Sequence, residues 1–373
     1  MPGIYIHIPF CRKACHYCNF HFSTTLHRRG EMLDAMRREI ELVIPLEPAT
    51  VDTLYFGGGT PSLLEPEEML GLMETIRLHF KITKNAEITL EANPDDIRPE
   101  KIDLWTSLGI NRLSIGIQSF REEDLSWMNR AHDAHQARQC IDIAHDGGIV
   151  NLSIDLIYGT PGLTDEAWLE NLRIASALRI PHLSCYALTV EPGTALDTMI
   201  RQQKRTAPVS ETQAAQFLML MDRLGEAGYE HYEISNFALP GMRSRHNSAY
   251  WQGTPYLGIG PSAHSYDGKD RKWNVANNAA YIRSLQEGRI PCESETLTDT
   301  QRLNEYVMTS LRTTEGMNMK WIRVEWGDAA ADRILRDAQP FFQSGKININ
   351  GNAVLLTREG KLFADGIAAE LFG

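Results

Sequence analysis

The sequence predicts an α/β protein in which an open barrel of six β/α units is followed by a smaller α+β domain. Over the first two thirds of the chain, short runs rich in β-branched and aromatic residues alternate with amphipathic helical stretches. This alternation is typical of a parallel sheet with right-handed helical crossovers. Six such units favour an incomplete barrel over a closed barrel of eight. Near the carboxyl end, helical patterns followed by a hairpin pattern indicate the second domain.

The barrel elements follow one another in a regular order. The strand candidates are residues 4–8, 51–56, 87–92, 112–117, 152–157 and 183–188. Each is a short apolar run rich in strand-forming residues. The amphipathic helical stretches between them include residues 32–43, 66–78, 134–144 and 166–178.

Beyond about residue 195 the pattern changes. A helix is expected over residues 211–227 and a strand over 229–237, followed by a stretch rich in glycine, asparagine and aromatic residues over 241–270. Helical patterns over 301–311 and 329–340 precede a hairpin over 346–356 with an Asn-Gly turn, which suggests a winged-helix-like shape. We therefore divide the chain into a barrel (1–235), a connecting segment (236–295) and a C-terminal domain (296–373).

Charge and cysteine content limit the function classes. The chain has 37 Lys and Arg against 48 Asp and Glu, a net charge of -11, and this balance argues against a nucleic-acid partner, which is bound mainly through basic side chains. No signal sequence and no uncharged apolar run of 18 residues is visible, so we expect a cytoplasmic protein. The six cysteines do not form a disulfide pattern, and Cys140, Cys185 and Cys292 are expected to be small buried hydrophobic residues.

Three cysteines follow the first strand candidate with C-x3-C-x2-C spacing: Cys11, Cys15 and Cys18. Three thiolates on one short loop can bind three irons of a [4Fe-4S] cluster and leave the fourth iron open. The alternative is a structural zinc site completed by His7, His16 or His21. Zinc sites usually pair two C-x2-C units, and no second cysteine pair follows, so the spacing favours the cluster.

Polar or glycine residues recur near the ends of all six strand candidates. They are the cysteine loop after the first, Gly57 to Thr60 after the second, Glu91 and Asn93 at the third, Gln118 after the fourth, Asp155 in the fifth, and Tyr186 and Ala187 at the sixth. In barrels of this kind the active site is built at the carboxyl ends of the strands. We therefore expect these residues to surround one site.

Residues 5–18, with the sequence YIHIPFCRKACHYC, resemble the cluster loop of the radical S-adenosylmethionine (SAM) superfamily. The longer form Y-x-H-I-P-F-C is similar to that of the oxygen-independent coproporphyrinogen III oxidase-like family, and the resemblance extends from Tyr5 to the last helix. The oxidases proper carry another cysteine two residues after the third, where this chain has Phe20. The departure points to the heme chaperone branch. The resemblance implies an open (β/α)6 partial TIM barrel and the C-terminal domain of the oxidase-like family.

The resemblance also implies which residues bind the cofactors. The three cysteines would bind the [4Fe-4S] cluster, Tyr5 would pack beside cluster and SAM, and Tyr17 would lie near the adenine. The other residues implied for SAM are Gly58, Gly59, Thr60, Glu91, Gln118, Arg130, Asp155, Ala187 through its backbone, and His264 on a glycine-rich loop.

Residues 246–251, with the sequence HNSAYW, resemble the H-N-x-x-Y-W motif of the heme chaperone branch. An imidazole beside two aromatic rings could bind heme iron axially. His246 is therefore the first candidate for a heme ligand, and His264 is the second.

Together these features predict a radical SAM-type heme chaperone that transfers heme to a heme-accepting protein. The implied cofactors are a [4Fe-4S] cluster, SAM and heme. The implied partners are the acceptor and an electron donor, with peripheral membrane contact through the acceptor. The main alternative is the oxidase itself, which decarboxylates coproporphyrinogen III to protoporphyrinogen IX in porphyrin biosynthesis. A structural zinc protein is the third interpretation, and the sequence leaves open whether the chain is an enzyme.

Overall fold

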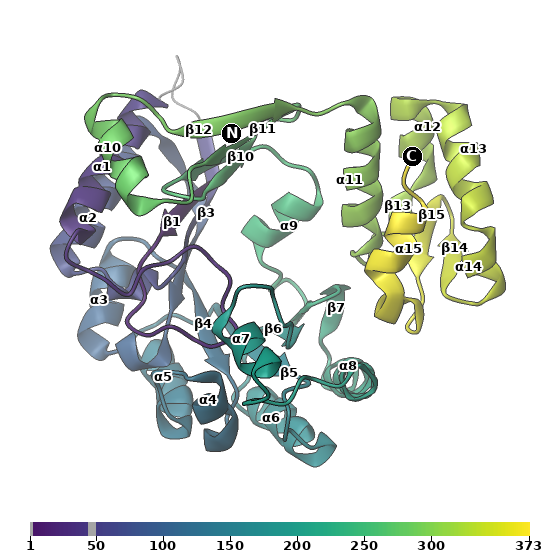
Figure 1. Ribbon diagram of the computed structural model, residues 1–373, viewed down its shortest axis with the longest axis horizontal. Coiled ribbons are helices and arrows are strands. Elements are labelled where there is room, and N and C mark those ends of the chain that lie inside the picture. The colour runs from purple at the N-terminus through teal and green to yellow at the C-terminus, as the bar shows by residue number, and fades with distance from the viewer. Residues whose placement is uncertain (1–2, 44–49) are drawn as a thin grey trace.

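One large twisted sheet organises the computed structural model, which describes residues 3–43 and 50–373 (Figure 1). Within these residues the sheet has 12 strands in the order β12-β11-β10-β9-β1-β2-β3-β4-β5-β6-β8-β7. The strands are β1 (Gly3–Ile8), β2 (Thr50–Gly58), β3 (Lys81–Ala92), β4 (Arg112–Gln118), β5 (Leu152–Tyr158), β6 (His182–Ala187), β7 (Glu230–Glu233), β8 (Asn236–Ala238), β9 (Tyr256–Ile259), β10 (His264–Tyr266), β11 (Asp270–Asn274) and β12 (Cys292–Thr296).

The predicted open β/α barrel is confirmed. Strands β1 to β6 are parallel neighbours in sequence order, and β12 and β7 lie at opposite ends of the sheet, so the barrel does not close. All six strand candidates form strands, although β3 begins at Lys81, earlier than expected.

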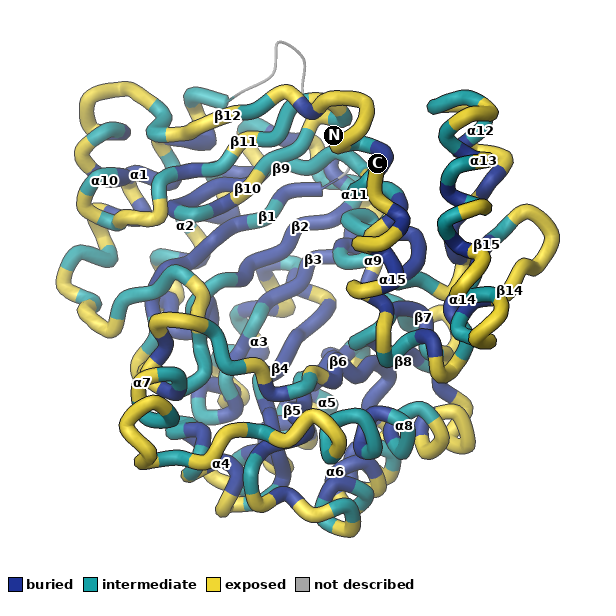
Figure 2. Tube along the Cα trace, turned by 45° about the vertical axis from the view of Figure 1, so that its right-hand side comes forward, coloured by how far each residue is buried: buried dark blue, intermediate teal, exposed yellow. Residues whose placement is uncertain are grey.

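Helices cover the outer face of the sheet, on the side away from α9 in Figure 1. They are α1 (Arg29–Leu42), α2 (Pro66–His79), α3 (Pro99–Ser107), α4 (Glu122–Met128), α5 (Ala134–Asp146) and α6 (Asp165–Ala177). The apolar faces of α1, α2, α3, α5 and α6 share one core with the strands, which includes Ile6, Leu90 and Trp168. Met128 of α4 belongs to a separate small cluster with Ile157 and Leu188. Figure 2 shows the resulting contrast between buried strands and exposed outer helix surfaces.

The inner face of the sheet carries polar side chains. Side chains of a strand alternate between its two faces, so Glu87, Thr89 and Glu91 of β3 share one face while Ile88 and Leu90 join the core on the other. The carboxyl ends of β2 and β3 continue into short 3-10 turns, η1 (Pro61–Leu63) and η2 (Pro94–Asp96). These turns redirect the chain at the rim of the site.

Residues 195–295 extend both edges of the sheet. The helices here are α7 (Ala195–Arg201), α8 (Ser210–Glu226), α9 (Arg245–Trp251) and α10 (Asn278–Gln286). The single strand expected over 229–237 is wrong, because the chain reverses at Ile234 and Ser235 and forms the antiparallel pair β7 and β8. In the connecting segment, β9 pairs parallel to β1 and β10 to β12 follow it antiparallel. Cys292 is exposed on β12, contrary to expectation.

The C-terminal residues form a second hydrophobic cluster around Val307, Ile322 and Val354. Its elements are α11 (Asp299–Leu311), β13 (Met317–Asn318), α12 (Met319–Trp326), α13 (Asp328–Asp337), α14 (Gln339–Gln343), β14 (Ile347–Asn350), β15 (Ala353–Leu356), η3 (Gly360–Phe363) and α15 (Ala364–Glu370). The expected hairpin is present as β14 and β15, and β13 joins it in a three-stranded antiparallel sheet, which fits a winged-helix-like shape.

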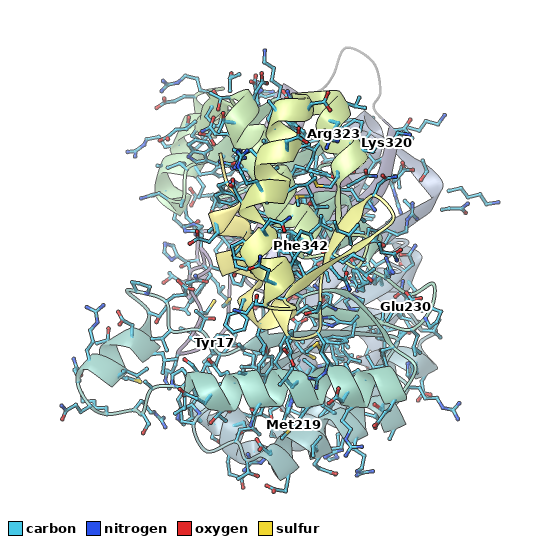
Figure 3. The ribbon with its side chains drawn as sticks, turned by 90° about the vertical axis from the view of Figure 1, so that its right-hand side faces the viewer. Tyr17, Met219, Glu230, Lys320, Arg323 and Phe342 are labelled. Atoms are coloured by element: carbon cyan, nitrogen blue, oxygen red, sulfur yellow. The ribbon has the colours of Figure 1, made fainter. Side chains whose placement is uncertain are left out.

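The C-terminal elements face the viewer in Figure 3, with α8 crossing below them. Arg358, just after β15, forms a salt bridge of 2.7 Å with Asp222 of α8. Among the described residues, no helix combines the length and apolar character needed to cross a membrane.

Candidate functional site

A cavity of about 370 Å³ opens at the carboxyl ends of the barrel strands. Residues from the loop after β1 and from strands β2 to β6 line it, as the recurring polar residues at the strand ends predicted. The predicted site residues among them are Cys11, Cys15, Tyr17, Cys18, Gly58, Gly59, Thr60, Glu91, Gln118, Arg130, Asp155 and Ala187. The fold thus gathers these residues around one space.

The loop that carries the three cysteines is held from both sides. At its start, Cys11 N donates to Ser23 O at 3.0 Å and Ser23 N donates to Pro9 O at 2.9 Å. Farther along, Asn129 Nδ2 donates to Ala14 O at 2.8 Å and Leu196 N donates to His16 O at 2.7 Å. The fold therefore fixes the loop over the cavity.

The thiols sit half-buried at the cavity. Burial raises the pKa of Cys11 to about 11 and raises the pKa of Cys18, so an unpaired thiolate is unfavourable there. Metal binding requires deprotonated thiols, and the positive charge of bound iron favours the thiolate. The donor set, three thiols on one loop facing a common space, fits a [4Fe-4S] cluster with three protein ligands.

The geometry argues against the zinc alternative. Among the described residues, no three His, Cys, Asp or Glu side chains converge closely enough to hold a single metal ion. Of the proposed histidine ligands, His7 uses both ring nitrogens in hydrogen bonds, Nδ1 with Tyr5 OH at 3.1 Å and Nε2 with His21 O at 2.9 Å. A cubane does not need such convergence, because each thiolate binds a different iron.

The glycines after β2 allow the backbone to pass close to the cysteine loop. A Cβ atom on Gly59 would lie 2.5 Å from Phe10 O, and Gly58 has a φ of +107°, which disfavours any side chain. Next to them, Thr60 Oγ1 donates to Cys11 Sγ at 3.5 Å. This segment forms a wall of the cavity. Because the two glycines have no side chains, a ligand can contact their backbone directly.

Glu91 is the carboxylate that is hydrogen-bonded to this segment. Tyr55 OH donates to Glu91 Oε1 at 2.8 Å, and Gly58 N donates to Oε2 at 3.1 Å. Burial raises the pKa of Glu91 to about 7 despite these hydrogen bonds. A cationic partner, such as the amino group of SAM, would stabilise the ionised form of this buried carboxylate.

Asp155 provides a second buried acid on β5. Its strand neighbour is Ser184 of β6, which also hydrogen-bonds to it. Burial raises the pKa of Asp155 to about 6, and the positive charges of Arg112 and Arg130 oppose this rise. The cavity therefore holds two acids whose charge depends on pH near neutrality.

Arg130 lies between the cysteine loop and strands β3 and β4. Nη1 donates to Cys15 Sγ at 3.2 Å, while Nη2 donates to Asn93 Oδ1 at 2.8 Å and to Gly116 O at 2.6 Å. Its Nε is buried and has no hydrogen-bond partner among the described residues. A guanidinium with a spare donor suits a bound carboxylate, so these residues also fit SAM.

Three predicted site residues do not line the cavity: Tyr5, His246 and His264. Tyr5 packs behind Gly57 and stacks on Tyr55 at 6.0 Å. His264 is exposed on β10, where its ring lies 6.3 Å from that of Trp273. The assignment of Tyr5 and His264 to SAM stays a prediction.

His246 is 2% exposed and lies inside the barrel. Its Nδ1 hydrogen-bonds to Thr53 Oγ1 at 2.8 Å and its Nε2 to Tyr250 OH at 2.9 Å. An axial heme ligand needs a free ring nitrogen that faces the iron, so the predicted heme role requires that Tyr250 or Thr53 give up its hydrogen bond. That role stays a prediction.

Some residues of the site were not predicted from the sequence. Tyr55, Ser184 and Asn247 line the cavity, and Tyr55 also holds Glu91 through a hydrogen bond. Ser184 was detectable, because Ser184 and Tyr186 are polar residues two positions apart and so mark the inner face of β6. Asn247 carried no such signal, since its place depends on the contact of α9 with β2.

Comparison with known proteins shows the family of the chain. The family model of the radical SAM superfamily matches residues 5–181, and that of the HemN C-terminal domain matches residues 297–363. A curated heme chaperone HemW of Mycobacterium tuberculosis is 35% identical over 377 residues, covering 100% of this chain and 95% of the relative. The heme chaperone HemW of Bacillus subtilis is 33% identical and is covered completely.

Among solved structures, the coproporphyrinogen III oxidase HemN of Escherichia coli, described as a radical SAM enzyme, superposes with a TM-score of 0.87 at 26% identity. The match covers 100% of this chain and 90% of the oxidase chain. The fold is thus shared with the oxidase, while the sequence is closer to the chaperones. The chain belongs to the HemW family within the radical SAM superfamily.

Proposed function

We propose that this protein is a heme chaperone, which binds heme and passes it to an acceptor protein. The observation that carries the proposal is the 35% identity to a curated heme chaperone over the whole chain, both domains included. Phe20 supports it, because the oxidases of the family are expected to have a cysteine at this position. Phe20 is 67% exposed and lines the cavity beside the cysteine loop.

The proposed resident cofactors are a [4Fe-4S] cluster on Cys11, Cys15 and Cys18 and SAM in the adjoining cavity. When bound, a reduced cluster of this kind supplies an electron for cleavage of the sulfonium of SAM. The chain itself contributes binding groups. Glu91 offers a carboxylate to the amino group, and Arg130 offers a guanidinium to the carboxylate.

The surrounding residues orient the ligand and keep its charged groups apart from water. The Gly58 and Gly59 main chain permits close approach, and Tyr55 donates a hydrogen bond to Glu91 that favours its orientation toward the cavity. We further propose a cytoplasmic location, an electron donor for the cluster, and peripheral membrane contact through the acceptor. A reducing compartment suits the six free thiols.

The second candidate function is oxygen-independent coproporphyrinogen III oxidase. The observation in its favour is the superposition on HemN with a TM-score of 0.87. The oxidase reaction would decarboxylate two propionates of coproporphyrinogen III. The two candidates differ in product, and one pair of assays separates them.

The experiment uses the anaerobically reconstituted full chain. Hemin titration followed at the Soret band should saturate with a Kd on the order of micromolar, equivalent to about -8 kcal/mol, and the bound heme should pass to apomyoglobin added as an acceptor. Incubation with coproporphyrinogen III, SAM and reductant should yield no protoporphyrinogen IX. Formation of protoporphyrinogen IX, or no saturable heme binding, would reject the chaperone function.

A further inference from the structure

The H-N-x-x-Y-W segment forms the inner floor of the barrel beneath the cavity. Figure 1 shows α9, which carries this segment, on the inner side of the sheet, opposite the outer helices. His246 hydrogen-bonds to Thr53, which lies four residues before Gly57 on β2. Asn247, the next residue of α9, lines the cavity.

Helix α9 is anchored to the strand that also carries Glu91. Glu87 of β3 accepts hydrogen bonds from Arg245 N and His246 N, both at 3.0 Å. Glu87 and Glu91 are four residues apart on one strand and therefore share its inner face. The position of His246 is thereby fixed relative to Glu91.

A short path of contacts joins His246 to the cavity. Its ring stacks on Tyr55 with the ring centres 5.0 Å apart and an angle of 25° between the planes. Tyr55 OH in turn donates to Glu91 Oε1 at 2.8 Å. Since both ring nitrogens of His246 are engaged, its ring cannot turn without breaking a hydrogen bond.

We propose that His246 is a positioning residue for SAM binding: it holds Tyr55, and through Tyr55 the carboxylate of Glu91, in the orientation that receives the amino group of SAM. This inference rests on the proposed binding of SAM in the cavity, and it is independent of heme transfer. The motif would then orient residues of the SAM site, and a residue other than His246 would be the axial ligand of heme.

The test measures SAM affinity by equilibrium dialysis on the reconstituted full chain. His246→Ala and Tyr55→Phe should each weaken binding about tenfold, the effect of misplacing one charge-assisted hydrogen bond. The double variant should be no weaker than either single variant, because both act on the same carboxylate. His246→Gln, which keeps a hydrogen-bonding group near Thr53, should recover part of the loss.

His182 offers a matched control. It is also completely buried, and its ring nitrogens hydrogen-bond to Ser153 and Tyr232, both at 2.7 Å, but it does not stack on Tyr55. His182→Ala should lower the melting temperature as much as His246→Ala does and leave the SAM affinity within about twofold. If His246→Ala does not fold, Tyr55→Phe and His246→Gln still carry the test.

Heme spectra of the same variants separate this inference from the proposed function. His246→Ala should keep the Soret band of the wild-type heme complex. Loss of that band with unchanged SAM affinity would overturn the inference and identify His246 as a heme ligand. Additive losses in the double variant would also overturn it. A wild-type protein that binds SAM with this coupling but no heme would reject the chaperone function and leave the inference standing.

Discussion

At the scale of single residues, the site depends on two acids kept away from water. Burial raises the pKa of Glu91 to about 7 and that of Asp155 to about 6. Groups with such pKa values change charge near neutral pH and are typical of functional sites. In the free protein at pH 6, Glu91 is therefore mainly neutral, and a cationic ligand must displace its proton.

We predict that SAM affinity rises with pH through the pKa of Glu91. The carboxylate binds an amino cation and the neutral acid does not, so affinity should increase about fivefold from pH 6 to pH 7.5 and level off near pH 8, where the amino group of SAM loses its own proton. Asp155 faces the same space and should steepen the loss below pH 6. Equilibrium dialysis across this range checks the prediction. Glu91→Gln should bind weakly with little pH dependence between pH 7 and 8, and an equally flat wild-type curve from pH 6 to 8 would contradict the role of Glu91.

The sequence identified the residues whose chemistry is visible at a strand end, such as Glu91 and Asp155. It did not identify Tyr55, because a tyrosine inside an apolar strand reads as core until the register between β2 and β3 is known. The sequence also predicted a heme-binding role for His246, and this prediction rested only on the residues that follow it in the chain. Its partners Thr53 and Tyr55 are almost 200 residues away, and only the tertiary structure brings them together.

At the scale of elements, helix α1 is tied to the sheet extension by a buried acid. Glu39 accepts hydrogen bonds from Gly260 N at 2.8 Å, from Asn274 Nδ2 at 2.6 Å and from Tyr281 OH. These partners belong to the turn after β9, to β11 and to α10. One side chain thus joins the first helix of the barrel to the segment that follows residue 255.

We predict that Glu39 makes stability depend on pH. Burial raises its pKa to about 7 in the folded protein, above the ordinary value of 4.5. Between these values the folded state holds a proton that the unfolded state releases, so stability should fall as pH rises from 4.5 to 7, by at most about 3 kcal/mol.

Melting temperatures of the cluster-free protein test this prediction. The melting temperature of Glu39→Gln should rise relative to that of the wild type as pH increases from 5 to 8, because glutamine has no proton to lose. Glu41→Gln is the control, since Glu41 lies on the same helix, is exposed and pairs with Arg38. Parallel curves for wild type and Glu39→Gln would show that the buried acid does not titrate in this range.

The elements predicted correctly are those with a local signal. Strands β1 to β6 and helices α1, α2, α5 and α6 follow from periodic patterns within each segment. Strand β9 has no comparable signal, because it is four residues long and its partner β1 lies about 250 residues earlier. The β7 and β8 hairpin was missed because its turn, Ile234-Ser235, lacks the Asn or Gly that marks most tight turns.

At the scale of the whole molecule, the C-terminal domain is attached to the open edge of the barrel. Arg312 forms a salt bridge of 3.0 Å with the buried Glu233 of β7, and its guanidinium lies over the ring of Trp251 at 5.3 Å. Trp251 ends α9. The domain therefore contacts the same helix that closes the floor of the cavity, which links the two parts of the chain structurally.

We propose that the cavity is built around a [4Fe-4S] cluster on Cys11, Cys15 and Cys18. Mössbauer spectroscopy and iron analysis of anaerobically reconstituted protein test it most directly. The wild type and the exposed-cysteine control Cys292→Ser should contain about four irons per chain with the spectrum of a cubane, and Cys11→Ser should lose that signal. A wild-type spectrum without a tetranuclear cluster, or unchanged iron in Cys11→Ser, would contradict the claim.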